Sequence, residues 1–243
     1  LSDIDGAGLA EPARLCAKSP KVSTQRLDVT DKDAVFAWAD AVVKDHGRVN
    51  LIFNNAGVAL GSTVEGMSYE ELEWLMGINS GGVVYGIKEF MPDLKASGDG
   101  HIINISSIFG LGSQPSQGAY NASKFAVRGF TEALRQEVAH TGVRVSCVHP
   151  GGIKTNIARA GRFYRDISGS KDAGRAAARF EQIARTTPAA AAQVIIDGIK
   201  SDAPRILIGA DARLIDRLQR LLPVGYAQVM AKLASFSERA KSS

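Results

Sequence analysis

Tyr120 and Lys124 are residues whose types and spacing could do acid–base chemistry. Residues four positions apart on a helix share one face, so both side chains would point to the same place. A lysine ammonium beside a phenol favours the phenolate and lowers the tyrosine pKa from its ordinary value of about 10. A phenol with a lowered pKa can give and take a proton near neutral pH. Alone, this spacing is common by chance and mostly marks a surface pair.

Polar and glycine residues also follow three apolar runs, at residues 49–53, 101–105 and 143–148. In open parallel sheets, ligands bind beyond the carboxyl ends of the strands, so residues placed there are candidates for one shared site. Ordinary turn chemistry is the competing interpretation, because glycine, proline, asparagine and serine are common in turns. The residues concerned are Asn54, Asn55, Ala56, Gly57, Ser106, Ser107, Pro150 and Gly151.

The elements that must position these residues alternate between strands and helices. Short apolar runs predict strands buried on both faces of a parallel sheet, at residues 22–29, 49–53, 101–105, 143–148 and 206–208. Helical spacing predicts helices around 35–43, over 69–95 with a break near Gly81, over 120–140, and from Pro188 onward. This alternation predicts an α/β fold, a doubly wound parallel sheet forming a single domain over residues 1–243.

Together these residues resemble the short-chain dehydrogenase/reductase family, whose sheet is Rossmann-like. Ser107 matches the catalytic serine of the family because it stands thirteen positions before Tyr120. The resemblance runs from the first residues to about Thr155, and beyond that point only the layout is similar. The residues that carry it are, in order, Asp28, Val29, Asn55, Ala56, Gly57, Asn79, Ser107, Tyr120, Lys124, Pro150, Gly151 and Thr155.

The resemblance implies an oxidoreductase that interconverts a secondary alcohol and a ketone or aldehyde with a nicotinamide cofactor. Tyr120 would give a proton to the carbonyl oxygen during reduction, or remove it during oxidation. Lys124 would lower the tyrosine pKa and hold the nicotinamide ribose, and Ser107 would hydrogen-bond the substrate oxygen. Asn79 would hold a water that links Lys124 to solvent. The hydride chemistry would belong to the cofactor.

The same resemblance implies a set of cofactor contacts. Thr155 would hold the nicotinamide carboxamide, with Ile153 beside it, and Asp28 and Val29 would contact the adenine. The full expected set is Asp3, Ile4, Asp28, Val29, Asn55, Ala56, Gly57, Tyr120, Lys124, Pro150, Gly151, Ile153 and Thr155.

Asp3 bears on which cofactor is used, because it follows what reads as a strand end. A carboxylate there can accept both hydroxyls of the adenosine ribose and repels a 2′-phosphate. No neighbouring arginine or lysine is evident in the sequence. We therefore expect NAD, with NADP less favoured.

The glycine-rich phosphate turn of the family is absent from this sequence. The segment Asp5-Gly6-Ala7-Gly8 is a poor substitute, because no strand fits before it and the third glycine is missing. We therefore expect the first strand and its turn to be missing, and about 30 further residues upstream, the usual size of such a unit.

Two later segments depart from the family pattern. Residues 153–187 occupy the position of the substrate loop, and the apolar Phe163, Tyr164, Ile167 and Phe180 hint at a hydrophobic substrate. Residues 210–243 predict a helical extension with an apolar stripe of Leu214, Ile215, Leu218, Leu221 and Leu222 among arginines. Packing on the domain or in a dimer is the first interpretation of this stripe, and contact with a membrane surface is the second.

The overall composition excludes several classes of protein. The net charge of +4 is mild and interspersed, which argues against a nucleic-acid partner. Cys16 and Cys147 have no metal-ligand spacing, so we expect no metal site, and the composition fits the reducing cytoplasm. The expected partner is a small alcohol or carbonyl compound, and the family implies a homodimer or homotetramer. A redox-silent dinucleotide-binding or scaffold protein on the same fold is the alternative.

Overall fold

Four parallel strands form the central sheet of the protein. They are β3 (Leu51–Asn54), β5 (His101–Ile105), β6 (Arg144–Pro150) and β8 (Arg205–Ile208), in the spatial order β3-β5-β6-β8. The computed structural model describes residues 1–239, and side-chain burial up to residue 232. The apolar runs become strands because helices cover both faces of the sheet, so every side chain of its middle can be buried. The predicted α/β class with a parallel sheet is confirmed.

Two short parallel pairs lie outside this sheet. The first joins β1 (Ser2–Asp3) to β2 (Gln25–Arg26), and the second joins β4 (Leu60–Gly61) to β7 (Arg162–Phe163). The expectation that the first strand is missing is not borne out, since a strand forms from the second residue. The prediction of one continuous sheet is also wrong in detail, because no ladder joins β1 and β2 to the four-stranded sheet among residues 1–239.

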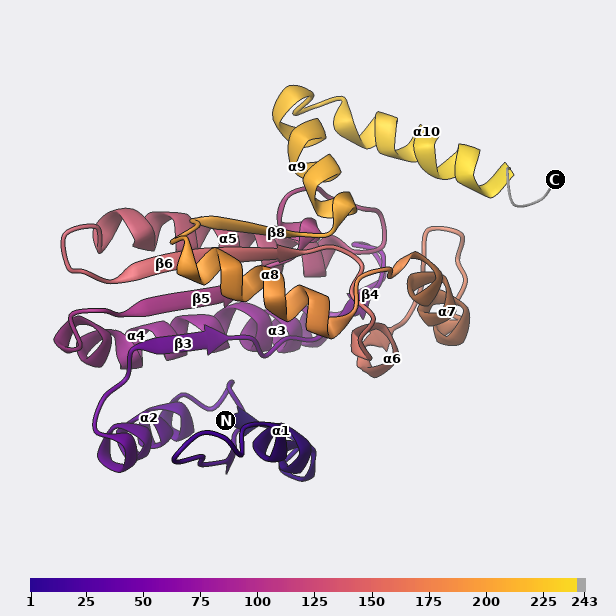
Figure 1. The fold of residues 1–243 in the computed structure, drawn as a ribbon. Coiled ribbons are helices and arrows are strands. Elements are labelled where there is room, and N and C mark those ends of the chain that lie inside the picture. Colours follow the sequence, from indigo (N-terminus) through magenta and orange to yellow (C-terminus); the bar gives the residue numbers. More distant parts are fainter. Residues whose placement is uncertain (240–243) are drawn as a thin grey trace.

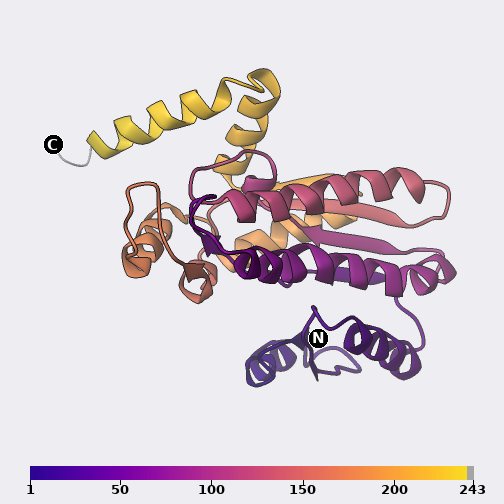
Figure 2. The ribbon, with the colours of Figure 1, turned by 180° about the vertical axis from the view of Figure 1, so that it is seen from behind.

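Helices cover the four-stranded sheet on both faces. Figure 1 shows α8 (Pro188–Lys200) across one face, and Figure 2, from behind, shows α4 (Gly82–Ala96) and α5 (Gly118–Glu137) across the other. Helix α2 (Lys32–His46) packs against α4. One apolar core fills the α4–α5 side, and a second, smaller core lies under α8. The sheet is thereby held rigid, and the segments at its carboxyl edge can be placed with precision.

The long helical segment after Ser68 contains the break that the sequence predicts near Gly81. Helix α3 (Tyr69–Met76) begins at a capping box between Ser68 and Glu71, which satisfies two free backbone N–H groups. A π-helical turn, η2 (Gly77–Gly81), then leads into α4 without leaving the helix axis. Such turns widen the helix by one residue and are frequent at functional sites.

The remaining elements lie around the carboxyl edge and the chain ends. Figure 1 shows α6 and α7 beyond the carboxyl ends of the strands, and α10 reaching away from the sheet. Within residues 1–239, no helix is long and apolar enough to cross a membrane. These elements are η1 (Ala7–Leu9), α1 (Ala10–Leu15), η3 (Ile108–Gly110), α6 (Ile157–Ala160), α7 (Ala173–Ile183), α9 (Ala210–Leu221) and α10 (Tyr226–Arg239).

The C-terminal helix α9 does not bury the apolar stripe that the sequence suggests. Its buried residues are Ala212 and Asp216, whereas Leu214 and Leu221 are 47% and 78% exposed. The helix is held by an ion pair from Arg205 to Asp216 rather than by its leucines. The last four residues of the predicted 210–243 extension lie outside the described residues.

Candidate active site

Helix α5 carries Tyr120 and Lys124 one turn apart, and both side chains are buried. The Lys124 Nζ lies 5.7 Å from the centroid of the Tyr120 ring. Phe109 packs against the same ring in an edge-on arrangement, with centroids 5.8 Å apart. The helix thus presents a phenol and an amine to one enclosed place, at the carboxyl edge of the sheet.

Burial is the largest influence on the pKa of each of these two groups. It raises the pKa of Tyr120 to about 12, and the side-chain hydrogen bond with Ser107 lowers it by less. It lowers the pKa of Lys124 to about 8, because an ammonium loses its hydration there. The prediction that Lys124 lowers the tyrosine pKa is therefore wrong in direction for the protein chain alone.

Lys124 keeps hydrogen-bonding capacity in spite of its burial. Its Nζ donates to the Ile105 carbonyl oxygen at 3.0 Å, the one hydrogen bond that it makes within residues 1–239. An ammonium has three N–H donors, so two are left for a ligand. A Cβ added to Gly57 would lie 3.3 Å from this nitrogen, which places the chain after β3 directly beside it. Two free N–H donors next to a glycine, which has no side chain to block a ligand, suit a pair of ribose hydroxyls.

Ser107 stands at the end of β5 and caps the short helix η3. Its Oγ accepts a hydrogen bond from the Phe109 N–H at 3.1 Å, as an N-cap side chain does. Its carbonyl oxygen accepts from the Gly110 N–H at 2.9 Å and pairs with the His149 Nδ1 at 3.1 Å. Ser107 is therefore held through both its hydroxyl and its carbonyl, next to the Tyr120 phenol.

Asn79 lies on the π-helical turn η2 and is fully buried. Its Oδ1 accepts from the Val58 N–H at 2.8 Å, and its Nδ2 donates to the Val58 carbonyl and to the Ser123 Oγ. Both amide donors are thus occupied by protein atoms. These bonds tie the segment after β3 to α5, and the expectation that Asn79 holds a water stays a prediction.

The other residues expected to bind the cofactor fall into three groups, of which the third follows β6. The first group lies beside Tyr120 and Lys124, a part of the site that we call the catalytic end. It contains Gly57, and Asn55 and Ala56 are exposed just before it. The second group, on and after the separate β1–β2 pair, comprises Asp3, Ile4, Asp28 and Val29.

Asp3 has a basic neighbour that the sequence does not reveal. Arg26 stands in register with Asp3 across the β1–β2 pair. The two residues are far apart in sequence, so only strand pairing brings them side by side. The carboxylate of Asp3 is also partly used, because it accepts from the Asp5 N–H at 2.9 Å.

The segment after β6 is held by the C-terminal part of the chain. The Gly152 N–H donates to the Asp211 carboxylate at 2.7 Å, and a Cβ on Gly151 would lie 2.1 Å from that carboxylate. Glycine is therefore required at 151. Pro150, the last residue of β6, is partly buried, and Ile153 packs into the core under α8.

Thr155 lines a cavity of about 370 Å³, together with Lys154, Asn156, Phe180, Glu181 and Ala184. This cavity joins the end of the β6 segment to helix α7, within the predicted substrate loop 153–187. Among the residues that the structure describes, no group of three His, Cys, Asp or Glu could hold a metal ion.

Three residues that support the site escape sequence reasoning. Ser123 receives the Asn79 amide and donates to the Tyr120 carbonyl, and Asn104 accepts a hydrogen bond from Asn54 across β3 and β5. Asp211 holds Gly152 from 59 positions away. The only available signal for Ser123 is its place inside the Tyr-x-x-x-Lys segment. For Asp211 no local signal exists, because the contact depends on the whole sheet.

Comparison with known proteins gives consistent results. The sequence model of a family described as short chain dehydrogenase matches residues 3–163, beginning within β1. A Mycobacterium tuberculosis protein named as an oxidoreductase, SadH, is 45% identical over 235 residues, covering 95% of this chain and 84% of that protein. The 3-alpha-(or 20-beta)-hydroxysteroid dehydrogenase of the same species is 37% identical over 152 residues, covering 63% of this chain and 57% of its own.

The fold is shared with solved structures. A short chain dehydrogenase/reductase from Burkholderia phymatum, in complex with NAD, superposes with a TM-score of 0.80 at 33% identity. The match covers 90% of this chain and 83% of that one.

Proposed function

The chain belongs to the short-chain dehydrogenase/reductase family, and we propose that it interconverts a secondary alcohol and a ketone or aldehyde with NAD(H), using Tyr120 as general acid and base. One observation carries the proposal: a buried phenol next to Ser107 stands beside a buried amine with two free donors. A structural pair would not leave buried donors unused, because each costs free energy.

In this mechanism the chain positions the reactants and moves one proton. Ser107 Oγ–H and Tyr120 Oη–H both donate to the substrate carbonyl oxygen and polarise it. Tyr120 then gives its proton to that oxygen during reduction, and takes it back during oxidation. Lys124 would hold the ribose hydroxyls with its two free donors and would offset the charge that develops on the phenol. The bound nicotinamide supplies or accepts the hydride.

Tyr120→Phe tests the assigned role. The variant keeps the ring and its contact with Phe109 but lacks the proton that the reaction needs. We expect turnover of a ketone panel to fall by at least about 100-fold, in line with the usual size of general acid–base catalysis. NADH binding followed by calorimetry should stay within a few-fold of wild type. Unchanged turnover would remove Tyr120 from the mechanism.

NAD rather than NADP is the cofactor that Asp3 favours, through repulsion of a 2′-phosphate. Arg26 in register with Asp3 acts in the opposite sense, so the preference should be moderate. Calorimetric titration with NADH and NADPH measures it. Asp3→Asn should raise the affinity for NADPH, whereas Arg26→Gln should lower it. If neither dinucleotide binds, the enzymatic assignment fails, and a scaffold protein on the same fold becomes the better interpretation.

A hydrophobic carbonyl compound is the proposed substrate class. Phe180 lines the cavity beside Thr155, and Tyr164 and Ile167 are exposed elsewhere in the same 153–187 segment. The relative named as a hydroxysteroid dehydrogenase acts, by its name, on a large apolar alcohol. Comparing kcat/KM for acetone, cyclohexanone and a steroid ketone tests this class; equal or falling values with increasing apolar surface would contradict it.

A further inference from the structure

His149 is a buried titratable residue that the proposed mechanism does not use. It lies on β6 and is fully shielded from solvent. Its Nδ1 is 3.1 Å from the carbonyl oxygen of Ser107, on the neighbouring segment after β5. Its Nε2 has no hydrogen-bond partner within the part of the chain that the structure describes. A half-satisfied imidazole beside the reacting serine calls for a physical explanation.

The contact with Ser107 decides which nitrogen carries the proton. A carbonyl oxygen can only accept, so the Nδ1 must be the donor. A neutral imidazole has one N–H, and the Nε2 is therefore a bare lone pair. Burial lowers the pKa of His149 to about 4, so the ring is neutral at physiological pH.

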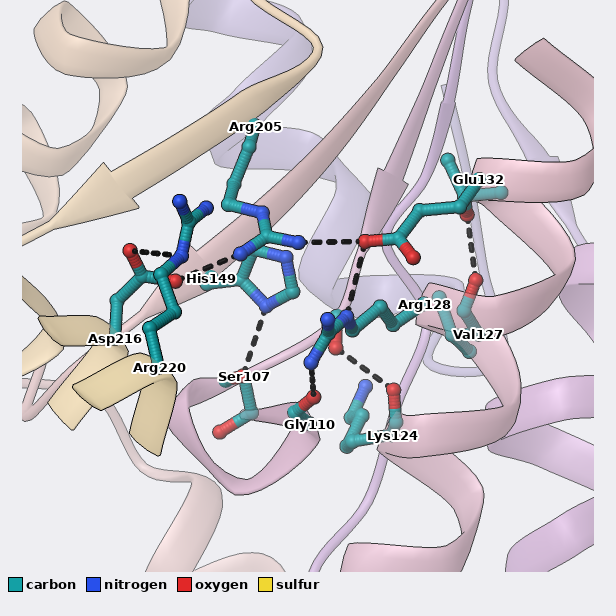
Figure 3. A network of polar contacts seen from close by, with 12 residues as sticks. Ser107, Gly110, Lys124, Val127, Arg128, Glu132, His149, Arg205, Asp216 and Arg220 are labelled. Atoms are coloured by element: carbon teal, nitrogen blue, oxygen red, sulfur yellow. Dashed lines mark hydrogen bonds and ion pairs between the residues drawn. The ribbon is translucent and has the colours of Figure 1, made fainter. Parts of the chain in front are cut away.

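The charges around His149 suit a lone pair at Nε2. Arg205 of β8 and Arg128 of α5 act on the imidazole, together with Glu132. Glu132 joins the two guanidinium groups, at 3.0 Å to Arg128 and 2.7 Å to Arg205. Figure 3 shows the ring beside Arg205, above Ser107. The two cations oppose protonation of the ring, and Glu132 favours it to a smaller extent, so an uncapped lone pair is stabilised.

This group of charges extends to helix α9. Arg205 also pairs with the buried Asp216 of α9 at 2.7 Å, and Arg220 pairs with the other oxygen of Asp216. On the opposite side, Arg128 donates to the carbonyl of Gly110, the last residue of η3. Figure 3 shows these contacts as one chain between α9 and the serine segment.

We propose that His149, in its neutral Nδ1–H tautomer, is a positioning residue that holds the main chain of Ser107 so that its hydroxyl faces Tyr120. The inference rests on the proposed function. Ser107 has an extended backbone, and its hydroxyl direction depends on where its carbonyl is held. Loss of the imidazole donor leaves the Gly110 N–H as the one remaining partner of that carbonyl among the described residues. A small misplacement of a reacting group costs large factors in rate.

The test compares His149→Asn with His149→Leu. The asparagine Nδ2–H can replace the Nδ1–H donor, whereas leucine keeps apolar volume and donates nothing. We expect His149→Leu to lower kcat on the order of tenfold to 100-fold, with NADH affinity little changed, and His149→Asn to recover most of the rate. His101→Leu is the matched control, because His101 is equally buried but lies at the opposite end of β5.

The outcomes separate positioning from a merely structural role. Equal rates in the two His149 variants, or the same loss of kcat in His101→Leu, would overturn the proposal. A second measurement does not need turnover: long-range ¹H–¹⁵N spectra of histidine-labelled wild-type protein report the tautomer. A protonated Nε2 on His149 overturns the proposal. If Nδ1 is protonated but the protein turns over no carbonyl compound, the proposed function fails. The assigned hydrogen bond from His149 to the Ser107 carbonyl would still hold in that case.

Discussion

Tyr120 and Lys124 show how burial sets the chemistry at the scale of single residues. The phenol stays protonated because charge is costly in its surroundings, with a pKa of about 12. The amine, with a pKa of about 8, is charged below that value and neutral above it. The chain by itself is thus prepared to give a proton to a carbonyl oxygen. Proton removal from an alcohol needs the further help of a bound, positively charged nicotinamide.

The rate of reduction should depend on pH through Lys124. We expect kcat/KM for NADH to fall as pH rises through about 8, because Lys124 then loses its proton. Tyr120 remains protonated across this range and cannot cause the fall. The measurement is a pH profile from 6 to 10. A profile of the wild-type enzyme that stays flat from pH 7 to pH 9 would contradict the assignment to Lys124.

Lys124→Met should stabilise the folded protein while removing activity. At pH 7 the lowered pKa of Lys124 means that its buried ammonium destabilises the folded state by about 3 kcal/mol. The variant would also lose the hydrogen bond to Ile105, which stabilises the folded state by about 1 kcal/mol. The unfolded lysine titrates near 10.5, so this penalty disappears as pH rises from 8 to 10.5. Urea unfolding at pH 7 should show a gain of about 2 kcal/mol that shrinks at pH 10. A loss at pH 7 would contradict the assignment.

At the scale of elements, the substrate loop is tethered rather than free. Strand β7 within it pairs with β4, and Phe163 packs so closely on Gly61 that a Cβ there would lie 2.4 Å from the ring. Arg162 stacks on Trp74 of α3, with its guanidinium 3.7 Å from the ring centroid. The loop is therefore tied to the body of the protein around Phe163, and the Ile167 N–H adds a hydrogen bond to the Ser116 Oγ.

Phe163→Ala should loosen this tether. We expect KM for the carbonyl substrate to rise several-fold with kcat less affected, because the loop contributes to binding rather than to proton transfer. Trypsin should also cut faster after Arg165 and Lys171. Leu221→Ala, which truncates an exposed side chain outside this loop, is the control. A cleavage rate equal to wild type would show that the β4–β7 pair does not restrain the loop.

Sequence reasoning predicts the elements well where a periodic pattern has one physical solution. The runs at His101 and Arg144 can only be buried strands, and the break near Gly81 is found as the π turn. Contacts that depend on the assembled sheet leave no local signal, as the Asp211–Gly152 bond and the buried Asp216 of α9 show. The direction of the Tyr120 pKa shift is missed for the same reason. The spacing of the sequence reveals the neighbouring Lys124, but it does not reveal that the phenol is buried.

For the molecule as a whole, two buried histidines predict sensitivity to acid. Burial lowers the pKa of His101 and of His149 to about 4, whereas an unfolded histidine titrates near 6.5. Each is neutral when folded, so the stability that it contributes is present above pH 6.5 and is lost as pH falls through 4.

Urea unfolding at pH 7 and pH 4.5 tests this. We expect the free energy of unfolding to fall by a few kcal/mol between the two values, after allowance for carboxylates. His101→Leu should lose less on acidification than wild type, because one of the two titrating rings is gone. An exposed control, His140→Gln, should behave as wild type. Equal acid sensitivity in His101→Leu and wild type would contradict the assignment.

The separation between the β1–β2 pair and the four-stranded sheet has a consequence for cofactor affinity. Asp3 and Asp28 lie with the smaller pair, whereas Gly57, Tyr120 and Lys124 lie with the larger sheet. A dinucleotide that contacts both would link the β1–β2 pair to the four-stranded sheet. Its dissociation constant would then report contacts with both parts. Nicotinamide mononucleotide, which is too short to reach Asp3, would report the contacts of the catalytic end alone.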